Sequence, residues 1–208
     1  MSQQLSKSRT VFLLLVGVAT ICFLASHDSG GDKPSDRATS TSLDSHAALP
    51  GADVAKRAAT IRNVLSVDPP SDKNGNVFVV KVKQGSIFEG GNTSKDVLHT
   101  IGNHAGKTPY VGVEIDMVET LVDGYGRQSD VPILRLDLSR DDVEKFNYDN
   151  IVGWNVLNMA HVSSLNPVSE HIVEQECAPD SENAKYAPDF CQAAANADTT
   201  LNTADASQ

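Results

Sequence analysis

The sequence predicts an α+β domain in which a small three-stranded sheet carries helices on one face, preceded by a single transmembrane helix. Three observations support this prediction. An uncharged apolar run lies near the amino terminus, three runs of alternating or β-branched residues follow it, and segments with apolar residues at helical spacing flank those runs. Packing helices over one face of a sheet is the simplest way to bury these apolar residues.

The apolar run at residues 10–26 predicts a membrane anchor. Its seventeen residues, rising about 1.5 Å each, span roughly 25 Å as a helix, within the range observed for spanning helices. Lys7 and Arg9 precede the run, and positively charged flanks tend to stay in the cytoplasm. We therefore expect a cytoplasmic N-terminus at 1–9 and a single-pass signal-anchor, with the remaining chain outside the cytoplasmic (inner) membrane.

A secretory signal peptide is the alternative interpretation of the same run. Signal cleavage requires small residues three positions and one position before the cut, and a cut after Ala25 places Phe23 at the first of these. Lipidation at Cys22 is disfavoured because Ile21 stands where a small residue is needed. A retained anchor is the better interpretation, with a secreted or periplasmic protein as the alternative.

Residues 27–51 predict a disordered polar tether, because Ser, Thr, Asp, Gly and Pro dominate and large apolar side chains are sparse. The extracytoplasmic α+β domain is expected at 52–176. Its first helix is predicted at 52–67, from apolar residues at helical spacing that end before two prolines.

The centre of the domain alternates between strand and helix patterns. A β-branched run at 77–83 predicts the first strand, and Ser94 is a candidate N-cap for a helix over 94–103. The alternating runs at 110–122 and 131–139 predict an antiparallel hairpin with a wide loop.

Two helices are predicted after the hairpin. Ser139 and Asp142 form a capping-box-like start for a helix over 140–146. The segment 150–162 has apolar residues at helical spacing and includes Trp154, which is expected in the core.

A last short helix or edge strand is expected at 169–177. The predicted order is then helix, strand, helix, strand, strand, helix, helix. Its middle portion resembles small modules that recur in the extracytoplasmic rings of bacterial secretion machines. The resemblance concerns element order alone and implies an analogy of fold.

Residues 177–208 predict an acidic flexible tail with a cysteine pair, because large apolar residues are scarce there. Cys177 and Cys191 are the only cysteines outside the apolar run. In an oxidising compartment they would form a disulfide that stabilises the fold by about 3 kcal/mol. Two unpaired surface thiols are the alternative, and their spacing does not match a zinc site.

Composition and motifs disfavour several function classes. The formal net charge of −10 repels phosphate, so we expect no nucleic-acid partner. The six histidines lack metal-ligand spacing, and the sequence has no nucleophile elbow, P-loop or dinucleotide fingerprint. We therefore expect no catalytic residue, metal or cofactor.

The loop at 123–130 carries a pattern that indicates a contact. Tyr125 and Arg127 alternate with glycines between the two hairpin strands, and Tyr and Arg are enriched where proteins bind one another. An ordinary turn with Gly124 and Gly126 at positive φ is the alternative.

These features predict a non-enzymatic, membrane-anchored extracytoplasmic module that binds protein partners in the envelope, as an accessory subunit of a bacterial secretion or transfer assembly. The alternative is a secreted small domain, released by signal cleavage, that binds a ligand or acts as an inhibitor. A hydrolase using His99 or His104 is a third hypothesis, which alanine at those positions tests.

Overall fold

The structure is a computed structural model, and it describes residues 50–197, 199 and 201. The expected transmembrane helix at 10–26, and the tether before residue 50, lie outside the described residues. Within the described range, none of the helices is both long enough and apolar enough to cross a membrane.

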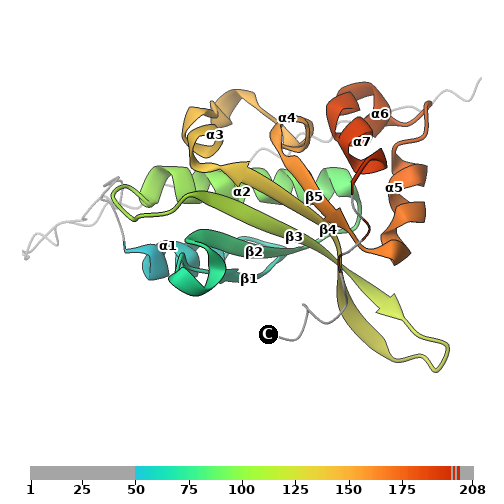
Figure 1. Cartoon of the computed structure of the whole chain (residues 1–208), viewed down its shortest axis with the longest axis horizontal. Coiled ribbons are helices and arrows are strands. Elements are labelled where there is room, and N and C mark those ends of the chain that lie inside the picture. Colours follow the sequence, from blue (N-terminus) through green and yellow to red (C-terminus); the bar gives the residue numbers. More distant parts are fainter. Residues whose placement is uncertain (1–49, 198, 200, 202–208) are drawn as a thin grey trace, which may run out of the picture. The chain divides into compact units, whose positions relative to one another are not determined.

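The domain is built on one five-stranded mixed sheet (Figure 1). Its strands lie in chain order: β1 (Val64–Asp68), β2 (Val77–Lys83), β3 (Gly112–Val122), β4 (Gln128–Ser139) and β5 (His161–Leu165). Only β2 and β3 pair in parallel, and the other neighbours are antiparallel. The parallel pair requires a crossover, which the long helix α2 (Ile87–His104) provides.

The described residues contain six further α-helices, α1 (Gly51–Ala58), α3 (Arg140–Lys145), α4 (Gly153–Met159), α5 (Glu170–Glu176), α6 (Glu182–Tyr186) and α7 (Pro188–Ala195). Helix α2 contacts β2 and β3 as well as α1, α3 and α4, so it forms the centre of the helical layer. The domain is therefore of the α+β class, as the sequence predicts.

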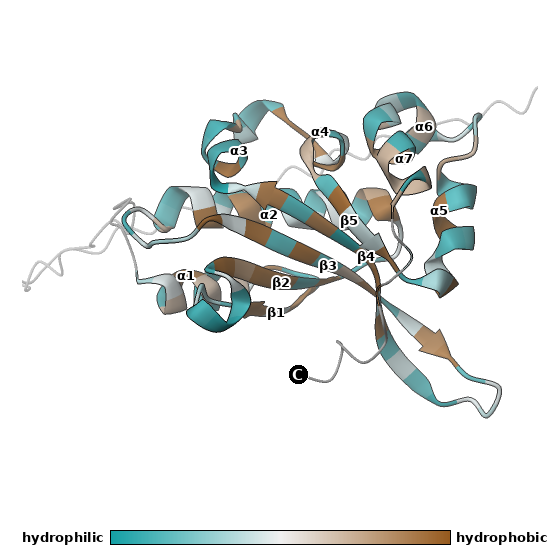
Figure 2. Ribbon diagram, in the orientation of Figure 1, coloured by the Kyte–Doolittle hydropathy of each residue, from teal (hydrophilic) through white to brown (hydrophobic). Residues whose placement is uncertain are grey.

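The predicted antiparallel hairpin is confirmed, and it supplies the core. Ile115 pairs with Leu136 and Met117 with Leu134, and all four side chains are buried. Figure 2 shows hydrophobic residues along the central strands. The alternation in the sequence therefore identified the buried face of both strands.

The expectation of three strands is wrong, because two further strands border the sheet. Helix α1 ends at Ala58, and β1 follows after Asn63, which adopts a positive φ of 68°. Strand β5 occupies the end of the segment predicted as a helix at 150–162. Both strands contain β-branched and polar residues next to a helical pattern, and pairing with β2 and β4 decides their conformation.

Helix α2 begins seven residues earlier than the predicted start at Ser94, because Ser86 caps it: the Ser86 side chain accepts from the Glu89 N–H. Gly91 then allows α2 to approach α4 closely. A Cβ at Gly91 would lie 2.9 Å from the carbonyl oxygen of Gly153. The glycines of this segment therefore allow close packing of the helix, although a glycine-rich sequence is more typical of a loop.

The chain after Cys177 also differs from the expected flexible tail, since it forms α6 and α7. Phe190 and Ala194 of α7 are buried in the core. One large apolar residue is enough to anchor this short helix to the core, because α7 packs against α4 and β5.

Candidate functional site

The two central strands extend beyond their neighbours. Strand β2 ends at Lys83, opposite Val118, and β5 ends at Leu165, opposite Leu134. Over residues 119–131, β3 and β4 pair only with each other within the part of the chain that the structure describes, and this segment projects from the sheet in Figure 1. We call this two-stranded segment the β-ribbon.

The tip of the β-ribbon is organised by Asp123. Its carboxylate accepts from the backbone N–H of Arg127 (3.0 Å), from the guanidinium of Arg127 (2.7 Å) and from the N–H of Tyr125 (2.8 Å). These hydrogen bonds, first that from the Arg127 backbone, hold the pKa of Asp123 below its ordinary value. Gly126 has a φ of 80°, which glycine adopts without strain.

Tyr125 and Arg127, the predicted contact residues, lie side by side at this tip. The Arg127 guanidinium is 5.5 Å from the centroid of the Tyr125 ring, and Tyr125 is 90% exposed. The turn therefore holds a planar aromatic ring and a cation together in solvent, and neither packs on the described part of the domain. Such a pair is suited to contacting another protein.

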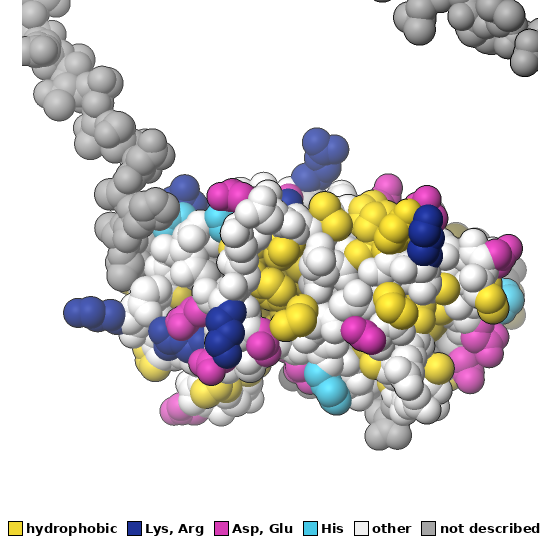
Figure 3. All heavy atoms as spheres, turned by 90° about the horizontal axis from the view of Figure 1, so that it is seen from above, with side chains coloured by type: hydrophobic (Ala, Val, Ile, Leu, Met, Phe, Trp, Pro, Cys, Tyr) yellow, Lys and Arg dark blue, Asp and Glu magenta, His cyan; other side chains and the backbone are white. Residues whose placement is uncertain are grey.

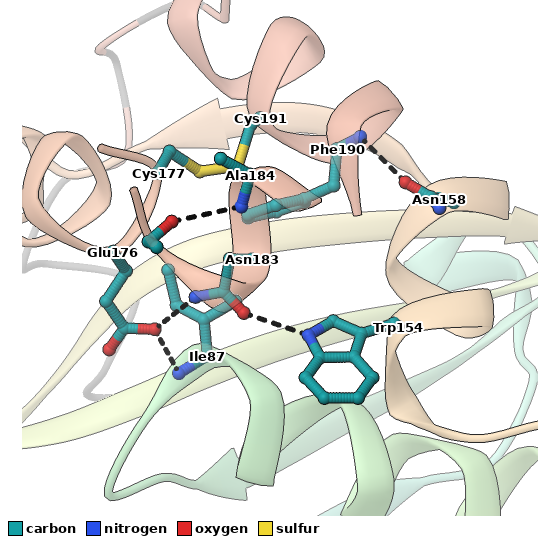
Figure 4. The surroundings of a disulfide bond; sticks show 10 residues. Ile87, Trp154, Asn158, Glu176, Cys177, Asn183, Ala184, Phe190 and Cys191 are labelled. Carbon is teal, nitrogen blue, oxygen red and sulfur yellow. Dashed lines mark hydrogen bonds between the residues drawn. A yellow bond between two sulfur atoms is a disulfide. The ribbon is translucent and has the colours of Figure 1, made fainter. Parts of the chain in front are cut away.

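The other predicted pair forms a disulfide: Cys177 and Cys191 are bonded, with their Cα atoms 5.5 Å apart. The bond joins the end of α5 to α7 (Figure 4). Disulfides persist in oxidising compartments and are rare in the cytosol.

A hydrogen-bond network beside the disulfide connects four helices, α2, α4, α5 and α6 (Figure 4). Glu176 accepts from the N–H of Ile87 at the start of α2 (2.9 Å) and from the side-chain amide of Asn183 (3.0 Å). The Asn183 oxygen accepts from the indole N–H of Trp154 (3.1 Å). Burial raises the pKa of Glu176 above its ordinary value.

Trp154 belongs to an aromatic group that is partly exposed. Its ring stacks on Phe88, with centroids 3.9 Å apart, and lies 4.7 Å from Tyr186. Figure 3 shows hydrophobic side chains gathered in patches on the face that carries α3, α4 and α6. The expectation that Trp154 lies in the core therefore holds in part, because it packs on the core but is half-buried.

The sheet carries a charged pair on its two central strands. Arg135 donates to both carboxylate oxygens of Asp116, at 2.7 and 3.1 Å, and lies 3.3 Å from Glu114. The Asp116 side chain is only 2% exposed. The two residues are opposite each other in β3 and β4, so the pair is best explained as a cross-strand structural contact.

His99 and His104, the residues of the hydrolase hypothesis, both lie on α2. His99 stacks on Tyr148, with centroids 4.9 Å apart, and His104 lies in the last turn of α2. Among residues 50–197, 199 and 201, no three His, Cys, Asp or Glu side chains are placed to hold a metal ion.

An apolar pocket of about 360 Å³ lies beside the disulfide. Leu165, Val173 and Ala194 contribute to its lining, together with the carboxylates Glu170 and Glu174.

Comparison with protein-family models, curated proteins and solved structures finds no match to this chain.

Sequence reasoning found the tip of the β-ribbon but not its edges. The sequence did contain an indication of these free edges, because the alternating run at 110–122 is longer than the strand predicted at 77–83. A longer central strand must leave part of its edge without a neighbour.

Proposed function

We propose that this chain is a membrane-anchored extracytoplasmic interaction module whose partner protein contacts the β-ribbon. It would serve as an accessory subunit of a bacterial envelope assembly for secretion or transfer. The observation that carries the proposal is the projection of the β-ribbon beyond the sheet, with Tyr125 exposed at its tip.

Three features support the proposed location. The apolar run at 10–26 predicts an anchor, the basic residues before it predict a cytoplasmic N-terminus, and the Cys177–Cys191 disulfide is typical of an oxidising space. A domain tethered to the outer side of the cytoplasmic membrane meets all three conditions. Washing membranes with alkaline carbonate is expected to leave the protein in the pellet, and its release would contradict the anchor.

The side chains at the tip are suited to binding and are not needed for packing. Tyr125 and Arg127 contact only the turn that presents them, as far as the described residues go. Because the turn is fixed by Asp123, the ring and the guanidinium are preorganised before a partner arrives.

The test is a site-specific photo-cross-link in the full chain, in its native membranes. Tyr125 is replaced by p-benzoylphenylalanine, and the control carries the same residue at the exposed position Lys73, on the short helix at Asp72–Asn74. We expect a discrete adduct with one protein from position 125 and none from position 73. No adduct from position 125, or the same adducts from both positions, would refute the proposal.

The alternative, a secreted domain that binds a small ligand, is favoured by the apolar pocket beside the disulfide. Sequencing the amino terminus of the mature protein separates the two proposals. A start near His27 would support the secreted form, and an intact start at Met1 would support the anchored form.

A further inference from the structure

The hydrogen bonds of the β-ribbon define which of its backbone groups face outward. The N–H of Gln84 donates to the carbonyl of Val118 (3.1 Å), so the peptide groups of Val118 point away from β4. In an antiparallel pair the direction alternates at every residue. Thr120 and Val122 therefore also point their N–H and C=O groups outward from β3.

The turn gives an independent check of this assignment. The N–H of Asp123 donates across the β-ribbon to the carbonyl of Arg127 (2.9 Å), so position 123 points inward. The outward positions of β4 follow from the register, in which Thr120 pairs with Asp130 and Val122 with Gln128. Both edges of the β-ribbon thus carry N–H and C=O groups without a ladder partner among the described residues.

The two edges differ in their capacity to accept another strand. Pro132 pairs with Val118, so it occupies an outward position at the base of the β4 edge, where it has no N–H to donate. Proline on an edge strand is a device that blocks pairing with other chains. The β3 edge has no such block at Thr120 and Val122, and it continues in line with β2.

The charges along the β3 edge indicate the chemistry of an added strand. Glu119 of β3 and Asp130, which faces Thr120 from β4, contribute carboxylates, whereas Asp123 in the turn is already paired with Arg127. Strand β2 shows what β3 accepts, because its end, Val80–Lys83, alternates valine with lysine and pairs with β3. A second copy of this chain would bring two acidic edges together, which disfavours self-association here.

We infer that the free edge of β3 at Thr120–Val122 accepts an extended, basic segment of the partner protein as an additional strand in line with β2. This inference rests on the proposed function, since both place the partner on the β-ribbon. Main-chain hydrogen bonds to Thr120 and Val122 supply the affinity, and the acidic side chains select lysine or arginine in the added strand.

The test uses a matched pair of substitutions on opposite edges. Val122→Pro removes an outward N–H from the β3 edge, and Gln128→Pro removes the equivalent N–H from the β4 edge of the same cross-strand pair. Neither N–H is part of the β3–β4 ladder. The unfolding temperature Tm of each variant is therefore expected to lie within about 4 °C of the Tm of the unmodified protein.

The probe is a fluorescein-labelled peptide of sequence VKVKVKV, with VEVEVEV as its charge control, titrated against the detergent-solubilised full chain. We expect the basic peptide to bind more tightly than the acidic one. Val122→Pro is expected to weaken that binding at least about tenfold, and Gln128→Pro less than about twofold. Equal binding of the two peptides, or equal losses in the two variants, would overturn strand addition. So would self-association of the chain through this edge in the absence of peptide.

The same substitutions separate this inference from the proposed function. Each is introduced into the chain that carries the photo-cross-linker at position 125. Loss of the adduct with Val122→Pro but not with Gln128→Pro supports strand addition. An adduct that survives both substitutions overturns strand addition and leaves the proposed function standing, whereas a missing adduct in the parent chain refutes the proposed function itself.

Discussion

The β-ribbon and the C-terminal cap, defined as residues 170–195 with α5 to α7, are stabilised in opposite ways. The cap is joined by the Cys177–Cys191 disulfide and buries Phe190 in the core. The β-ribbon is held by its own ladder and by the Asp123 turn, and Val122 is 61% exposed. The cap therefore contributes to global stability, while the exposed end of the β-ribbon, residues 122–130, contributes little to it.

This difference separates residues that hold the fold from residues that are free to bind. Glu176 in the cap connects α5 to the start of α2 and to α6, so a change there affects three elements. Among the described residues, Tyr125 contacts only its own turn. Substitutions in the cap should alter stability, and substitutions of Tyr125 or Arg127 at the tip of the β-ribbon should alter binding alone.

The largest effect is expected from removing the disulfide. The pair Cys177→Ser and Cys191→Ser releases a loop with a sequence separation of 14. The free energy of unfolding is expected to fall by about 3 kcal/mol, because the unfolded chain gains conformational freedom. Urea unfolding followed by the fluorescence of Trp154, the sole tryptophan, measures this change.

The same variant tests whether the cap positions Trp154. Its indole N–H donates to Asn183, which lies between the two cysteines in the sequence. A shift of the native emission spectrum is expected when the disulfide is absent. If both the stability and the emission spectrum were unchanged, the cap would not stabilise the fold, and its proposed difference from the β-ribbon would be contradicted.

A smaller effect is expected at Glu176 and depends on pH. Burial raises the pKa of this carboxyl in the folded protein, the nearby carboxylates of Glu119 and Glu89 raise it further, and the two hydrogen bonds it accepts oppose the rise. The folded state then binds the proton more tightly than the unfolded state. Stability from this group is present at low pH and is lost as pH rises through the folded-state pKa.

Glu176→Gln is expected to remove that part of the pH dependence. Glutamine keeps one oxygen that accepts from Ile87 and Asn183 and carries no charge to bury. Urea unfolding from about pH 4 to 7 should show a less negative slope of stability against pH than in the unmodified protein. Glu174→Gln, at an exposed position of the same helix, is the control and should keep the original slope.

The hairpin and the disulfide were predictable because their signals are local. Alternation in β3 and β4 fixes which side chains face the core, and only two cysteines lie outside the apolar run. The α+β class follows from the same patterns.

Strands β1 and β5, and helix α7, were not predictable from local patterns. β1 and β5 are five residues each and lie at the ends of segments with a helical pattern, so only their pairing with β2 and β4 makes them strands. Helix α7 has one large apolar residue, Phe190, and its burial depends on distant contacts with α4 and β5. The free edge at Thr120 and Val122 required knowledge of where both neighbouring strands end.

The smallest effect on stability is expected at the tip of the β-ribbon. Tyr125→Ala and Arg127→Ala remove side chains that pack on no described residue outside the turn, so the free energy of unfolding should change by less than about 0.5 kcal/mol. Asp123→Ala is the informative contrast, because three hydrogen bonds converge on its carboxylate and hold the turn. Amide hydrogen exchange of residues 119–131 should increase with Asp123→Ala and remain unchanged with Tyr125→Ala. If Tyr125→Ala also increased exchange in the β-ribbon, the ring would be a structural part of the turn, and its exposure would no longer indicate a surface kept for a partner.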